Sequence, residues 1–104
     1  MKYGLKDSIL ENLVHVFAKY PKIEKVLLYG SRAKGNYKNG SDIDLTLIGE
    51  NLDLQDLNKV SLDLDELYLP YSFDLSIFEN IENEELIEHI SRIGVTIYER
   101  PVRC

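Results

Sequence analysis

The chain contains few residues suited to covalent cross-linking or soft-metal binding, and what it lacks excludes several classes of protein. Its one cysteine, Cys104, is the last residue. A single thiol can form neither an internal disulfide nor a Cys-rich zinc site, so we expect Cys104 to be incidental. No apolar run approaches the length of a membrane span, and the first residues lack the apolar segment of a signal peptide. We therefore expect a cytoplasmic protein without a membrane partner.

Basic residues are also in the minority. The sequence has 12 Lys and Arg against 18 Asp and Glu, a formal net charge of -6. Affinity for a phosphate backbone comes mainly from clustered Lys and Arg, so we expect no nucleic-acid partner. With 104 residues, 44% of them hydrophobic, the chain can build one core. Because neither a linker nor a repeat divides it, we expect a single domain over residues 1–104.

The spacing of apolar residues predicts an α/β (α+β) protein in which a small mixed sheet of three to four strands is flanked by helices. Helical spacing predicts helices over residues 7–19, 54–67 and 84–93, with a short helical segment within 30–35. A continuous apolar run predicts a strand over 25–29, and alternating apolar residues predict strands over 42–48, 72–78 and 95–98. A helix between the second and third strands implies a right-handed parallel crossover, which would place Asp44 beside Asp74.

The first predicted strand ends in Gly30-Ser31. A strand that ends in a Gly-Ser turn can aim backbone N–H groups at a phosphate. Gly30 and Gly35 have the opening spacing of a P-loop, but Asn36 and Tyr37 follow where a P-loop has Lys and Ser or Thr. The turn therefore indicates a nucleotide site of another kind.

Three aspartates follow this turn on predicted strands. Asp42 and Asp44 are one residue apart, so a strand would place both carboxylates on one face, about 7 Å apart; Asp74 lies on the next strand. Three acids with no basic residue among them repel one another unless cations neutralise them. Oxygen ligands suit Mg²⁺ or Mn²⁺, and two such ions with a triphosphate suit nucleotidyl transfer. In the alternative interpretation, Asp42 caps a turn and Asp44 pairs with a lysine.

Taken together, residues 28–35, the Ser41-Asp42-Ile43-Asp44 segment ten residues after Ser31, and Phe73-Asp74-Leu75 resemble the polymerase-β-type nucleotidyltransferase superfamily. The likeness runs from about residue 5 to residue 99 and is strongest to its minimal nucleotidyltransferases, antitoxins of HEPN/MNT toxin–antitoxin pairs. It implies that Gly30 and Ser31 hold the β- and γ-phosphates of ATP, with Arg32 neutralising them. It also implies that Asp42 and Asp44 bind two Mg²⁺ ions and that Asp74 completes the metal site and orients the acceptor hydroxyl.

The same resemblance implies a partner. A small helical HEPN-type ribonuclease toxin would carry the acceptor, a tyrosine hydroxyl. The chain itself would form a homo- or hetero-oligomer. Two other functions stay open: a non-catalytic antitoxin that acts by occlusion, and transfer to a small molecule such as an antibiotic. We expect His15 and His89 to be surface or interface residues rather than ligands. We expect the acidic run to be a solvated face or part of a partner surface; it comprises Glu79, Glu82, Glu84, Glu85 and Glu88.

Overall fold

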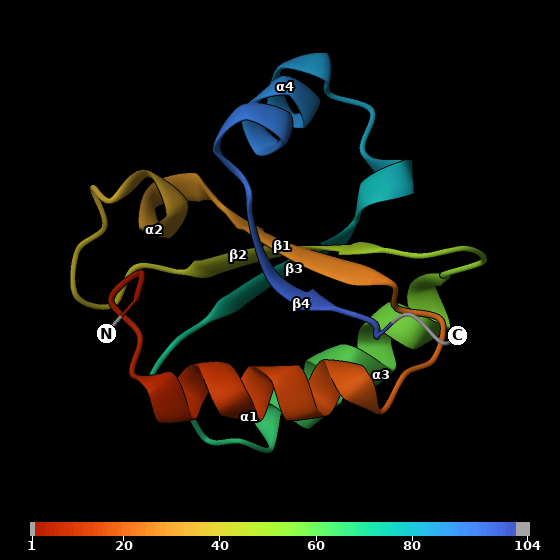
Figure 1. The fold of residues 1–104 in the computed structure, drawn as a ribbon, viewed down its shortest axis with the longest axis horizontal. Coiled ribbons are helices and arrows are strands. Elements are labelled where there is room, and N and C mark those ends of the chain that lie inside the picture. The colour runs from red at the N-terminus through yellow and green to blue at the C-terminus, as the bar shows by residue number, and fades with distance from the viewer. Residues whose placement is uncertain (1, 102–104) are drawn as a thin grey trace.

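The computed structural model describes residues 2–101, and Cys104 lies outside them. Its elements confirm the predicted order of helices and strands (Figure 1). They are α1 (Asp7–Ala18), β1 (Lys25–Tyr29), α2 (Gly30–Lys34), β2 (Ile43–Ile48), α3 (Leu54–Asp65), β3 (Phe73–Ile77), the short 3-10 helix η1 (Phe78–Asn80), α4 (Glu84–Ile93) and β4 (Val95–Glu99). Asp42 thus lies just before β2 rather than within it, and α3 ends at Asp65, two residues earlier than the apolar spacing predicted.

The four strands form one mixed sheet in the order β3-β2-β1-β4. β1 is antiparallel to both of its neighbours, whereas β2 and β3 are parallel. A parallel pair needs a long connection between its strands, and α3 provides it. In this pair Asp44 lies opposite Asp74 in register, as the crossover predicted.

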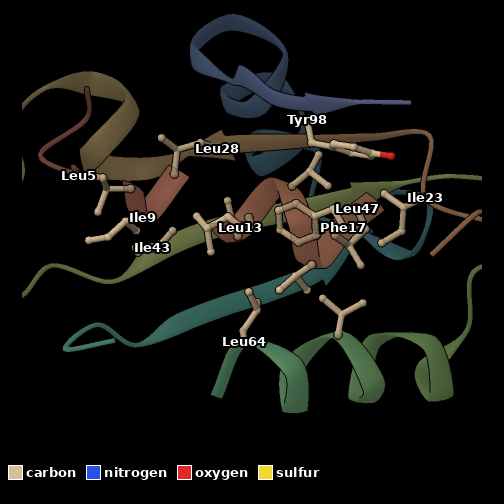
Figure 2. Packing of buried hydrophobic residues seen from close by; sticks show 14 residues of the cluster. Leu5, Ile9, Leu13, Phe17, Ile23, Leu28, Ile43, Leu47, Leu64 and Tyr98 are labelled. Atoms are coloured by element: carbon tan, nitrogen blue, oxygen red, sulfur yellow. The ribbon is translucent and has the colours of Figure 1, made fainter. Parts of the chain in front are cut away.

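The apolar core lies on one face of the sheet. α1 and α3 lie on that side and α4 on the other (Figure 1). Phe17 of α1 and Leu64 of α3 point toward the sheet, to which β1 contributes Leu28 (Figure 2). α3 begins with a reciprocal capping box, in which the side chains of Asp53 and Asp56 each accept a hydrogen bond from the other residue's backbone N–H. Covering this face fixes the sheet that carries the polar residues described below.

The opposite face of the sheet carries the polar side chains. Since successive side chains on a strand alternate between faces, core residues Leu28 and Leu45 direct Tyr29 and Asp44 to the other side. α4 packs there against β1 and α2. Within residues 2–101, no helix combines the length and the apolar character that crossing a membrane requires.

Candidate active site

One row of residues crosses three adjacent strands at the end where β1 stops. Tyr29 is the register partner of Asp44, and Asp44 is the partner of Asp74. Neighbouring strands in a sheet are about 4.8 Å apart, so the three side chains lie side by side on the polar face. Asp42 lies two residues before Asp44, at the same end of the sheet. The fold therefore gathers the three aspartates predicted from sequence at this end of the sheet.

The charges of these acids act on one another. Burial raises the pKa of Asp44, and the neighbouring carboxylates of Asp74 and Asp42 raise it further. The ion pairs formed within residues 2–101 involve none of the three, so the lysine partner that the alternative interpretation gave Asp44 is not among them. The pKa of the adjacent Tyr29 is raised as well, mainly by burial and further by the negative charges of Asp74 and Asp44.

An oxygen-only, uncompensated donor set of this kind fits Mg²⁺ or Mn²⁺. Nowhere in residues 2–101, however, do three His, Cys, Asp or Glu side chains converge closely enough to hold a metal ion by themselves. Mg²⁺ is usually bound by one or two carboxylates together with waters and substrate phosphates. The aspartates therefore suit ions that arrive with a nucleotide better than a permanent metal centre.

Gly30 occupies a position that other residues would fit poorly. Its φ of +75° lies in the left-handed region, and a Cβ atom built on it would collide with Oδ2 of Asp44. The absent side chain thus makes room for a carboxylate. Ser31 follows in the first turn of the five-residue α2, whose preceding residue, Tyr29, does not cap it with its side chain. The first turn of α2 thus lies directly beside Asp44.

Arg32 is buried and its guanidinium is bound to backbone carbonyls, so the phosphate contact predicted for it would require the side chain to leave these bonds. The residue is only 2% exposed. Its Nε and Nη2 donate to the carbonyl of Ser41 at 3.2 and 2.9 Å, and its Nη1 donates to the carbonyl of Tyr3 at 2.9 Å. The guanidinium also lies over the rings of Tyr37 and Tyr71, 5.3 and 4.9 Å from their centroids. Arg32 therefore fixes the backbone immediately before Asp42.

His89 is a site residue that the sequence interpretation missed. Its Nε2 accepts a hydrogen bond from the backbone N–H of Gly30 at 3.1 Å. Its ring meets the ring of Tyr29 edge-on, with centroids 6.2 Å apart and an interplanar angle of 78°. Leu86, Ile90 and Ile93 form an apolar stripe along α4, and position 89 falls within that stripe. That helical spacing was the available signal that His89 faces inward rather than toward solvent.

The family model described as polymerase beta, nucleotidyltransferase matches residues 11–102. Among curated proteins, no match was found.

Several solved structures share the fold. A chain of a toxin–antitoxin crystal structure with AMP-PNP is 20% identical, with a TM-score of 0.70 over 92% of this chain and 75% of that one. A chain of the tri-AMPylated Shewanella oneidensis HEPN toxin in complex with MNT antitoxin is 15% identical, with a TM-score of 0.69 over 92% and 74%. A chain of the toxin–antitoxin MntA-HepT, also 15% identical, has a TM-score of 0.69 over 91% and 74%. Because the family model covers most of the sequence, the chain belongs to the polymerase beta nucleotidyltransferase family.

Proposed function

We propose that this chain transfers AMP from ATP to a hydroxyl group in a Mg²⁺-dependent reaction. The observation that carries the proposal is the row of paired strands in which Asp44 lies opposite Asp74 while Gly30 leaves space for the Asp44 carboxylate. Nucleotidyl transfer needs negative charge that can bind cations next to a turn that can bind phosphates, and this edge of the sheet supports both.

The aspartates and the Gly30–Ser31 turn have different roles in this proposal. Asp42 and Asp44 would hold two Mg²⁺ ions, which Mn²⁺ could replace, and Asp74 would complete the metal site. When bound, the ions would neutralise the phosphate oxygens and the pyrophosphate leaving group. Ser31, in the first turn of α2, holds the β- and γ-phosphates, and Gly30 shapes that turn.

The reaction itself is an in-line displacement. The acceptor oxygen forms a bond to the α-phosphorus while the bond from that phosphorus to the bridging oxygen of pyrophosphate breaks. Asp74, exposed at the edge of the sheet, orients the acceptor hydroxyl and takes its proton. The products are the AMP ester of the acceptor and pyrophosphate.

For the acceptor we propose a tyrosine hydroxyl on a HEPN-type toxin in the cytoplasm, which this chain would neutralise as an antitoxin. The support is the common fold with chains of toxin–antitoxin crystal structures, one of which contains a tri-AMPylated HEPN toxin. An antitoxin that acts by occlusion alone is the competing function, and a small-molecule acceptor is the third. Both would leave the toxin unmodified.

The test is transfer of label from α-³²P-ATP with Mg²⁺ to a co-expressed HEPN-type toxin, followed by mass spectrometry of its tyrosine peptides. We expect an added AMP with the wild-type chain and none with Asp44→Asn. Asp65→Asn is the matched control, since Asp65 is exposed at the end of α3, on the other side of the sheet. Protection of cells by Asp44→Asn equal to that by wild type, with no modified toxin in either case, would establish occlusion instead.

A further inference from the structure

We propose that His89 is a positioning residue, which holds the Gly30–Ser31 turn in the conformation that receives the triphosphate. This inference rests on the proposed function and adds to it a residue from α4, an element that contributes none of the predicted site residues. Its basis is the hydrogen bond from the Gly30 N–H to Nε2 of His89, together with the edge contact between the His89 and Tyr29 rings.

An external contact would help the turn to keep its shape. Gly30 has more backbone freedom in the unfolded chain than any other residue type, so ordering it at one φ carries a high entropic cost. The collision that a Cβ would make with Asp44 means that this freedom cannot be removed by a larger residue. A hydrogen bond to the backbone N–H is a further way to hold the turn, and His89 supplies the acceptor.

The β1–β4 ladder stops short of the Gly30 N–H. β4 begins at Val95, which pairs with Leu28, so the β1–β4 ladder ends one residue before Tyr29 and does not extend to Gly30. α4 comes immediately before β4 and packs over this point of β1 and over α2. His89 on its inner face therefore supplies an acceptor where the ladder stops.

The contact also fixes the chemical form of the ring. An imidazole nitrogen can accept a hydrogen bond only when it carries no proton, so the contact requires a neutral ring with its proton on Nδ1. A side chain with an acceptor at the same place can therefore substitute for His89, and one without an acceptor cannot.

Two substitutions separate the hydrogen bond from the packing. His89→Phe keeps a ring that can meet Tyr29 but has no acceptor, whereas His89→Gln loses the ring and keeps an amide oxygen that can accept from Gly30. His89→Leu serves as a second variant without an acceptor if the phenyl ring is too large for the space. His15→Phe is the matched control, because His15 is exposed on α1, on the far side of the sheet.

The first measurement is calorimetric titration with ATP and Mg²⁺. Loss of one hydrogen bond corresponds to a weakening of about five- to tenfold, which we expect for His89→Phe. His89→Gln should stay within about twofold of wild type, and so should His15→Phe. Wild-type affinity in His89→Phe, tighter binding in that variant, or weaker binding in His89→Gln than in His89→Phe would each overturn the inference.

The second measurement uses no nucleotide. Amide hydrogen exchange at Gly30 in ¹⁵N-labelled, ligand-free protein should be protected in wild type and His89→Gln and faster by about tenfold in His89→Phe, as expected for loss of one hydrogen bond. Equal exchange in all three would overturn the inference without reference to ATP. If exchange behaves as expected but the wild type binds no ATP with Mg²⁺, the proposed function fails and His89 only holds the turn.

Discussion

Replacing Asp44 with asparagine should make the ligand-free protein more stable. Burial and the charges of Asp74 and Asp42 all raise the pKa of Asp44, so the folded protein disfavours its ionised form. Two unit charges about 5 Å apart repel by about 0.8 kcal/mol at the dielectric constant of water and by about 3 kcal/mol at a dielectric constant of 20. Asp74 is exposed, so solvent screening favours the lower figure. We expect a gain of about 1 kcal/mol, or a rise in Tm of about 4–8 °C.

The sign of this effect also sets its pH dependence. A carboxyl group whose pKa is raised on folding costs stability when it ionises, so the cost grows as pH rises above about 4. The gain in Asp44→Asn should therefore be complete at neutral pH and should disappear in acid. Asp65→Asn makes the same change of charge at an exposed position and should leave the Tm nearly unchanged.

Thermal unfolding with and without 10 mM Mg²⁺ and ATP is the assay. A ligand present at about 100 times its Kd stabilises the folded state by about 2.7 kcal/mol, so the wild-type Tm should rise above that of Asp44→Asn once the ligands are added. The order of the two proteins should thus reverse. A lower Tm for ligand-free Asp44→Asn, or an undiminished ligand shift in that variant, would refute the reasoning.

Three further substitutions test other contacts. Gly30→Ala should lower the free energy of unfolding by about 1–3 kcal/mol in chemical denaturation, because its positive φ and the nearby carboxylate both oppose a Cβ; an unchanged stability would contradict this conformation. Arg32→Met should cost about 2–4 kcal/mol in the same assay by leaving the half-buried Ser41 carbonyl without its donors, and unchanged stability would show that these bonds contribute little. Tyr20→Phe should lose about 1 kcal/mol at neutral pH with its hydrogen bond to Asp63. Burial and Asp63 raise the pKa of Tyr20 to about 12, so this contribution is present below pH 10 and lost as pH rises toward 12; equal pH profiles for wild type and variant would argue against the bond.

The sequence predicted best what depends on local periodicity. An apolar run located β1 and alternating apolar residues located β2 within a residue, and the crossover rule placed Asp44 beside Asp74 from the sequence alone. The sequence did not predict what lies where a Gly30 side chain would be: the Asp44 carboxylate occupies that space.

Contacts between distant segments could not be predicted in the same way. Whether Arg32 points outward or inward depends on Tyr3, Tyr37 and Tyr71, which come together only in the folded chain. The same is true of His89, which accepts a hydrogen bond from the N–H of Gly30, 59 residues away in the sequence. The position of Arg32 next to a Gly-Ser turn suggested a phosphate ligand. Propensity and spacing contain no information about which aromatic rings surround a side chain, so its actual surroundings could not be predicted.

The buried guanidinium of Arg32 also gives the beginning of the chain a place in the active-site framework. Lys2 and Leu5 exchange backbone hydrogen bonds around a tight turn, and the Tyr3 carbonyl within it shares Arg32 with the Ser41 carbonyl, one residue before Asp42. An affinity tag or a truncation at this end would therefore act on a proposed metal ligand through a single side chain. Recombinant protein for enzymology should carry its tag elsewhere, since a weakened metal dependence in N-terminally fused protein could otherwise be mistaken for a property of the enzyme.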